Sequence, residues 1–324
     1  MATFSRDDDG TWTVALDDTD ATDRNEVHDE AVVRYMTTFD KAFTAASEKC
    51  EAEFVKALLR VWSLKDAGWD PYETTLRAVP AMVDLHELIP TGDQDYETSR
   101  HLALWTYGHI LEASEPPAML ADLLHIADGG WFMPLRFADV PSRKPRPGED
   151  ESDVPKRPMR FQDEKLPVLE ELAAKAVMPD VLDPIREVWD RDLRNAVFHA
   201  DYTIHGSEVR IPARSKTYTH DEFQALINRA LAYHEALAML RESYLRSYAD
   251  PVVIPIHPDQ VTHPDEMAVV MVREGHGAIG LKHAYTAEQV AAGAIAWHVA
   301  RLYPDEAEAI RADPTLANFP ARAD

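Results

Sequence analysis

The stretch VVRYMTTFDKAFTAA, residues 32–46, decides the fold class of this chain. Its apolar side chains recur at steps of three and four residues, which is the spacing of one face of an α-helix. The members of this stripe are Val32, Val33, Met36, Phe39, Phe43 and Ala46. The pattern predicts a long helix that begins near Glu26 and buries this face.

Similar spacing extends outward from this stretch over most of the chain. It predicts further helices over residues 73–89, 95–114, 116–129, 163–177, 181–200 and 219–248. The segment YTIHGSEVRI, residues 202–211, alternates instead around a turn, and it predicts a β-hairpin with Gly206 and Ser207 at the tip. We therefore expect a mainly α protein, a helical bundle with one small hairpin.

Composition divides the chain into five expected segments. They are a mobile N-terminal segment (1–25), an N-terminal helical region (26–139), a basic proline-rich linker (140–160), a second helical region (161–250) and a small α+β C-terminal unit (251–324). Residues 11–16 fit a short strand as well as a mobile tail. In the last segment we expect strands at 267–272 and 278–282 and helices near 286–302 and 304–312.

The charge and cysteine content limit the classes of function. The 324 residues carry a net charge of −24, so phosphates are repelled over most of the surface and a general nucleic-acid coat is excluded. Cys50 is the single cysteine, so no disulfide can form within the chain, which fits a reducing compartment. No apolar run reaches the roughly 18 residues of a membrane span. We therefore expect a soluble cytoplasmic protein that does not bind membranes.

The segment RNAVFHADY, Arg194 to Tyr202, carries the side chains best suited to chemistry. Asn195 and His199 are four residues apart and share a helix face, which Arg191 extends. Arg194 and His199 lie about 140° apart around the helix, so both reach a groove along it. An arginine suits a phosphate and a histidine transfers protons near neutral pH, so together they suit RNA phosphodiester cleavage by the 2′-hydroxyl.

A purely structural interpretation of the same residues is open. In it Arg194 pairs with Asp190, four residues earlier, and His199 only complements the helix dipole. Asn195 then makes local hydrogen bonds and Tyr202 is a core anchor.

The motif RNAVFH, residues 194–199, resembles the signature of the HEPN superfamily, in which an arginine and a polar residue precede a histidine. Residues 107–117, YGHILEASEPP, ahead of this motif also resemble a bacterial protein group with no assigned activity. The resemblance implies a HEPN-type helical bundle that acts as a dimeric, metal-independent endoribonuclease in bacterial defence or toxin–antitoxin stress response. It implies catalytic roles for Arg194, Asn195, His199 and Tyr202, with Arg191 as a phosphate contact.

The implied partners are RNA, a second copy of the chain, and a protein antitoxin or defence partner. No cofactor is expected. No metal is expected either, because His86-Glu87 lacks a second histidine four residues on and Pro90 breaks that helix. A non-catalytic HEPN-like module for dimerisation or partner binding is the alternative.

Overall fold

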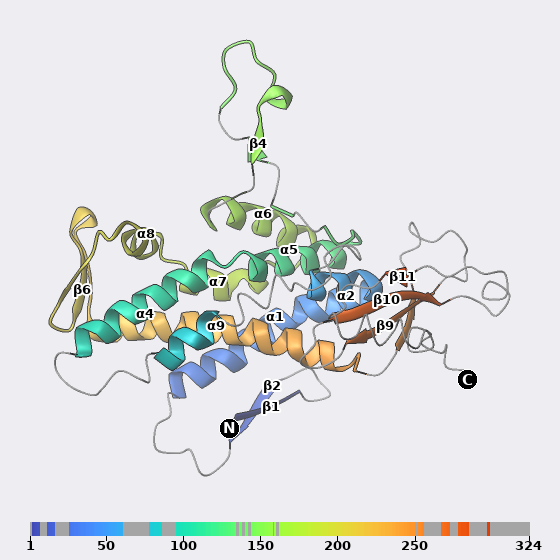
Figure 1. The fold of residues 1–324 in the computed structure, drawn as a ribbon, viewed down its shortest axis with the longest axis horizontal. Helices are drawn as coiled ribbons and strands as arrows, with labels where there is room; N and C mark the ends of the chain where they lie inside the picture. Colours follow the sequence, from blue (N-terminus) through green and yellow to red (C-terminus); the bar gives the residue numbers. More distant parts are fainter. Residues whose placement is uncertain are drawn as a thin grey trace, which may run out of the picture. The chain divides into compact units, whose positions relative to one another are not determined.

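The described part of the chain is mainly helical, as the sequence predicts (Figure 1). The computed structural model describes residues 2–6, 12–16, 26–60, 78–85, 95–133, 136–137, 140–141, 144–157, 159, 162–249, 252–255, 267–272, 278–284 and 297–298. The predicted helix over 73–89 is helical at 78–85, and its other residues lie outside the described part.

The chain forms two compact units, each assembled from three stretches. The first comprises residues 1–41, 73–117 and 159–240, and the second comprises 42–72, 118–158 and 241–324. The five segments expected from composition remain a prediction about domain boundaries.

The first unit is built mainly from helices. They are α1 (Glu26–Lys49) and α9 (His220–Arg246), which both continue into stretches of the second unit, together with α4 (Asp95–Glu112), α6 (Gln162–Lys175), η4 (Pro179–Leu182), α7 (Asp183–Val188) and α8 (Arg191–His199). The predicted stripe of residues 32–46 begins in this core, where Val32, Met36 and Phe39 are fully buried. Phe39 packs edge-on against Tyr233 of α9, with the ring centroids 5.8 Å apart.

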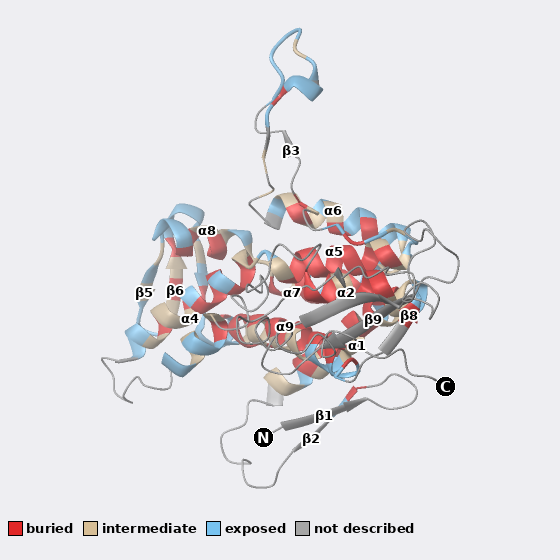
Figure 2. Ribbon diagram, turned by 45° about the vertical axis from the view of Figure 1, so that its right-hand side comes forward, coloured by how far each residue is buried: buried red, intermediate tan, exposed pale blue. Residues whose placement is uncertain are grey.

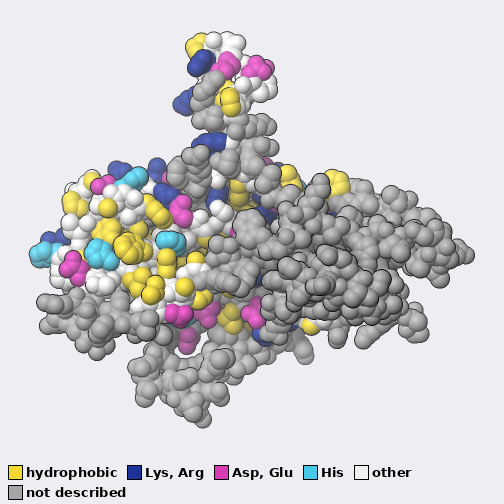
Figure 3. Space-filling view, viewed as in Figure 1, with side chains coloured by type: hydrophobic (Ala, Val, Ile, Leu, Met, Phe, Trp, Pro, Cys, Tyr) yellow, Lys and Arg dark blue, Asp and Glu magenta, His cyan; other side chains and the backbone are white. Residues whose placement is uncertain are grey.

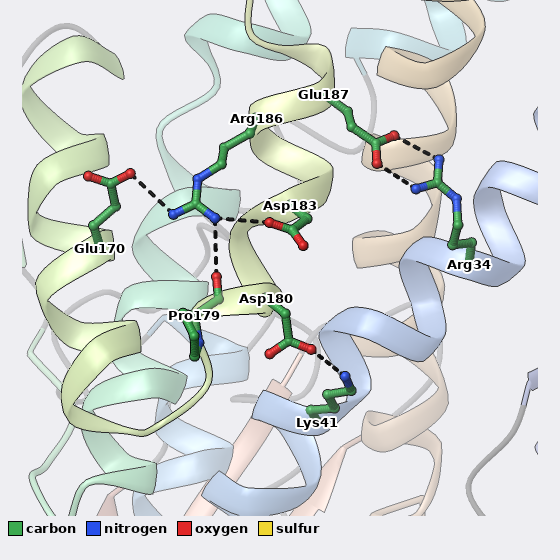
Figure 4. Close-up of polar contacts among 8 residues, drawn as sticks. All are labelled: Arg34, Lys41, Glu170, Pro179, Asp180, Asp183, Arg186 and Glu187. Atoms are coloured by element: carbon green, nitrogen blue, oxygen red, sulfur yellow. Dashed lines mark hydrogen bonds and ion pairs between the residues drawn. The ribbon is translucent and has the colours of Figure 1, made fainter.

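Ion pairs fasten α7 and η4 to α1 within this unit (Figure 4). Both Nη atoms of Arg34 donate to the two carboxylate oxygens of Glu187, at 2.5 and 2.7 Å. Tyr35 donates to the same carboxylate at 2.7 Å, and Lys41 pairs with Asp180. These contacts hold the segment that leads into α8.

The expected single helix over residues 181–200 is wrong. The chain leaves the helix at Trp189 and Asp190, which are both extended, and starts again as α8. Tyr107 of α4 accommodates this break, because its hydroxyl donates to the Val188 carbonyl at 2.9 Å and accepts from the Asp190 N–H at 3.0 Å. The backbone groups freed by the interruption therefore keep partners, which the periodicity alone does not reveal.

The predicted hairpin is confirmed and carries one more strand. β5 (Thr203–His205) and β6 (Glu208–Ile211) turn at Gly206, whose φ of +56° suits glycine. β7 (Lys216–Tyr218) pairs with β6 after the short helix η5 (Pro212–Arg214). Figure 2 shows that β5 is largely exposed whereas β6 is partly buried.

Of the two alternatives for the N-terminus, the structure has the strand. β2 (Trp12–Leu16) pairs antiparallel with β1 (Ala2–Arg6). A capping box forms the start of α9. Thr219 N–H donates to the Glu222 carboxylate at 2.9 Å, and the Glu222 N–H donates back to Thr219 Oγ1 at 3.3 Å.

The second unit combines helices with small sheets. It contains α2 (Glu51–Leu59), most of α5 (Glu115–Ala127), the short helix η3 (Glu151–Asp153) and the strand pair β3 (Val140–Pro141) and β4 (Lys156–Arg157). An antiparallel sheet has the order β11-β10-β9-β8. Its strands are β8 (Val252–Pro255), β9 (Met267–Val272), β10 (Ala278–Ala284) and β11 (Trp297–His298).

The strands predicted in the C-terminal segment are thus confirmed. The helix expected over 286–302 is wrong at Trp297–His298, which pair with β10 through Lys282 and Leu281. Strand pairing across the sheet prevails there over the local apolar spacing. The other residues of that helix, and the helix expected at 304–312, lie outside the described part.

A buried charge cluster stabilises the second unit. Asp122 of α5 is fully buried and pairs with Arg60 and with Arg136, the latter at 2.7 Å. Asp122 Oδ1 also accepts from the Met133 N–H at 3.2 Å.

Among the helices that the structure describes, none has the length and apolar character needed to cross a membrane.

Candidate functional site

Helix α8 begins at a strong cap. The Asp190 carboxylate accepts from the N–H groups of Asp192 and Leu193, each at 3.1 Å. Its other oxygen accepts from Lys216 at 2.7 Å and from Tyr218 at 2.8 Å, so the cap also holds β7. Burial disfavours ionisation, but these hydrogen bonds outweigh it, and the pKa of Asp190 lies below its usual range.

An open groove of about 720 Å³ runs along α8. Four of the predicted site residues line it, namely Arg191, Arg194, Asn195 and His199. Further residues of α8 and of the turn after it, together with residues of α6, of the break before α8, of β6 and of η5, complete the lining; they are Asp163, Glu164, Trp189, Asp192, Ala196, Asp201, Ile211, Ala213 and Arg214. The expectation that Arg194 and His199 reach a common groove is therefore met.

Arg194 is held firmly at the wall of this groove. It is 8% exposed, and its Nε and Nη2 atoms pair with Glu112, the last residue of α4. Its Nη1 donates to Asn195 Oδ1 at 2.7 Å, and its guanidinium carbon lies 5.1 Å from the centroid of the Phe198 ring. The pairing of Arg194 with Asp190, expected in the structural interpretation, is wrong because Asp190 caps α8 and binds β7.

His199 differs from Arg194 in its exposure. It is the last residue of α8 and is exposed at the groove, so its imidazole meets solvent and any bound molecule. Ala200 follows in the left-handed conformation and ends the helix, with its N–H bonded back to α8. An exposed imidazole and a fixed guanidinium therefore line the same groove.

The remaining predicted residues have different surroundings. Arg191 is 69% exposed and pairs with Asp163 of α6 at 3.0 Å. Tyr202 is half-buried and is not among the residues that line the groove. Its hydroxyl lies 2.7 Å from His101 Nδ1 of α4, so Tyr202 contacts α4 instead of the groove.

The electrostatics of the groove are mixed. Acidic and basic side chains both line it: Asp163, Glu164, Asp192 and Asp201, and Arg191, Arg194 and Arg214. Arg214 lies 3.5 Å from Asp192, so each of the three arginines has a carboxylate partner. A phosphate entering this groove must compete with these carboxylates or sit beside them.

Glu112 is the partner of Arg194 that the sequence did not predict. It lies within the segment of residues 107–117 noted above, but nothing in its spacing links it to Arg194, which is far along the chain. Lys165 of α6 is also near Glu112. Burial lowers the pKa of Lys165, while Glu112, Glu115 and Glu164 oppose this effect.

Comparisons with known proteins assign no family. No protein-family model matches the chain, and no curated protein or solved structure is significantly similar to it. Among the described residues, no group of three or more His, Cys, Asp or Glu side chains is placed to hold a metal ion. The site is therefore interpreted from its own geometry.

Proposed function

We propose that the groove along α8 is the active site of a HEPN-type, metal-independent endoribonuclease. One observation carries this proposal: a fixed arginine, its asparagine neighbour and an exposed histidine line the same open groove. Arg194 and His199 supply the two functions that cleavage of an RNA phosphodiester needs, a stabiliser for the charged phosphate and a proton acceptor.

In the proposed reaction, His199 takes the proton of a 2′-hydroxyl group. The 2′-oxygen attacks the adjacent phosphorus, the bond from phosphorus to the 5′-oxygen breaks, and the leaving oxygen takes a proton from water. Arg194 stabilises the negative charge that develops on the phosphoryl oxygens, and Asn195 orients Arg194 through the Nη1 hydrogen bond. The products are a 2′,3′-cyclic phosphate and a 5′-hydroxyl end.

Partners follow from the same resemblance. In HEPN enzymes two subunits contribute to one cleft, so we propose that the active form is a homodimer. A role in bacterial defence or in a toxin–antitoxin stress response would require a protein that restrains the nuclease. RNA is the proposed substrate, and Arg191 is proposed as an additional phosphate contact at the rim of the groove.

A second candidate function is a non-catalytic HEPN-like module for dimerisation or partner binding. The observation that favours it is the pairing of Arg191, Arg194 and Arg214 with carboxylates. A neutralised arginine binds phosphate more weakly than one with no anionic neighbour. In this alternative, Arg194 and Glu112 serve mainly to join α8 to α4.

Incubation of purified protein with mixed-sequence RNA in EDTA separates the two candidates. Because general acid–base groups typically contribute about 10²–10⁴-fold, we expect His199→Ala to slow cleavage by that factor. His205→Ala is the matched control, since His205 is an exposed histidine of β5 that does not line the groove. Equal inertness of wild type and variants, at concentrations where the protein is dimeric, contradicts the nuclease and supports the binding module.

A further inference from the structure

An aromatic surface lies beside the groove on α4 and α8. Trp105 of α4 is 52% exposed and Phe198 of α8 is 47% exposed. Figure 3 shows hydrophobic side chains and histidines gathered over these two helices. A contiguous patch of exposed apolar rings is typical of a surface that binds a ligand or partner.

The rings are held in place rather than loosely attached. The Phe198 ring lies on Gly108 of α4 so closely that a Cβ at Gly108 would come within 3.1 Å of it. The His101 ring contacts the rings of both Trp105 and Tyr202, with centroid distances of 6.4 and 5.5 Å. The hydrogen bond between Tyr202 and His101 fixes this arrangement further.

The aromatic surface is continuous with the proposed active site. Phe198 directly precedes His199 and stands one helical turn after Arg194, whose guanidinium carbon lies 5.1 Å from the ring centroid. An RNA strand that places a phosphate at Arg194 would therefore bring the neighbouring bases over Phe198 and toward Trp105. Successive bases of single-stranded nucleic acid stack on aromatic side chains in this way.

We propose that Trp105 and Phe198 form a stacking surface for the bases of single-stranded RNA next to the groove. This inference rests on the proposed function and names its substrate as unpaired RNA. Stacking also provides binding energy that does not depend on the charge of the groove. With a net charge of −24 and paired arginines, phosphate attraction is weak, so affinity must come from contacts that do not depend on phosphate charge.

The aromatic character of the surface and its position next to Arg194 favour RNA as its occupant. The large exposed apolar side chains of α4 and α8 in the described part are all aromatic, namely Tyr96, Trp105 and Phe198. The exposed aliphatic side chains Leu85, Met133 and Val177 lie on other segments. Aromatic faces stack with any base, and Phe198 adjoins Arg194, the proposed phosphate contact, so single-stranded RNA is the occupant that we propose.

The test measures binding of a fluorescein-labelled, 2′-O-methylated RNA oligonucleotide by anisotropy. This probe has no free 2′-hydroxyl, so its binding is independent of cleavage. Loss of one stacked base costs on the order of tenfold in Kd, so we expect that weakening for Trp105→Ala and for Phe198→Ala. Trp105→Phe should restore most of the affinity, because it keeps a ring.

Trp131→Ala is the control, since Trp131 is similarly exposed, at 42%, but belongs to the second unit. Thermal unfolding shows whether each variant is folded. Unchanged Kd in both alanine variants overturns the proposal, as does wild-type protein that binds no oligonucleotide. If the Trp105→Ala or Phe198→Ala variant no longer sediments as a dimer but binds RNA with unchanged affinity, the proposal is also overturned. The surface is then assigned to contact with a second copy of the chain.

The same measurements separate this inference from the proposed nuclease. Wild-type protein that binds the methylated RNA through Trp105 and Phe198 but does not cut unmodified RNA contradicts the nuclease alone. Wild-type protein that cuts RNA while both alanine variants keep its Kd and KM contradicts the stacking surface alone.

Discussion

Two arginine–carboxylate clusters, one in each unit, differ in what surrounds them. In the second unit, the Asp122 side chain is 0% exposed and the side chains of Arg60 and Arg136 are 5% and 8% exposed. In the first unit, Glu112 is 27% exposed and its partner Arg194 lines an open groove. The enclosed cluster can only stabilise its unit, whereas the open one can also meet a ligand.

The largest expected effect comes from breaking the enclosed cluster. Asp122→Ala leaves Arg60 and Arg136 buried without their shared carboxylate, so we expect a loss of about 3–5 kcal/mol in the free energy of unfolding. Urea unfolding followed by circular dichroism measures this change. Glu171→Ala is the control, because the Glu171–Lys175 pair is exposed and its removal should have little effect.

Breaking the open cluster should cost less stability and affect function. Glu112→Gln keeps the shape of the side chain but removes the charge opposite Arg194, so we expect a loss of about 2 kcal/mol. We also expect slower RNA cleavage, because the guanidinium loses its fixed orientation. Unaltered cleavage by a folded Glu112→Gln variant would contradict a positioning role for Glu112.

The same contrast between enclosed and open groups extends to histidines. Burial lowers the pKa of His234 on α9 to about 4, whereas His199 is exposed. Since this pKa lies below the unfolded value of about 6.5, the stability contributed by neutral His234 is complete above pH 6.5 and is lost as the pH falls toward 4.

From pH 7 to pH 5 this single group should therefore lower the free energy of unfolding by about 2 kcal/mol. His234→Leu should remove that part of the pH dependence, and His199→Ala should leave it unchanged. Urea unfolding at the two pH values measures the difference. An equal pH dependence in wild type and His234→Leu would show that other groups cause it.

The smallest expected effect is at the rim of the groove. Arg191 is 69% exposed, so Arg191→Ala should change the free energy of unfolding by less than about 1 kcal/mol despite the loss of the Asp163 pair. If Arg191 contacts a phosphate, KM for RNA should rise while kcat stays nearly constant. A fall in kcat with constant KM would indicate a role in the reaction step instead.

Periodicity predicted most of the helices because burial of one face repeats along the chain. It missed the break at Trp189 and Asp190, because the hydroxyl that satisfies the freed backbone groups comes from Tyr107 on another helix. The helical spacing of the motif at residues 194–199, extended by Arg191, likewise placed four predicted residues on one groove. Glu112, Asp163 and Arg214 could not be predicted, since only the tertiary fold brings them to α8.

We propose that the groove of Arg194 and His199 cuts RNA by using the 2′-hydroxyl of the RNA. The most direct test is a DNA oligonucleotide that carries a single ribonucleotide between randomised flanks, incubated with the protein in EDTA. We predict one cut, directly 3′ of the ribonucleotide, with a 2′,3′-cyclic phosphate end, and no cut by His199→Ala. Cutting of the all-DNA control, or an intact ribonucleotide site while His199→Ala and wild type behave alike, would contradict it.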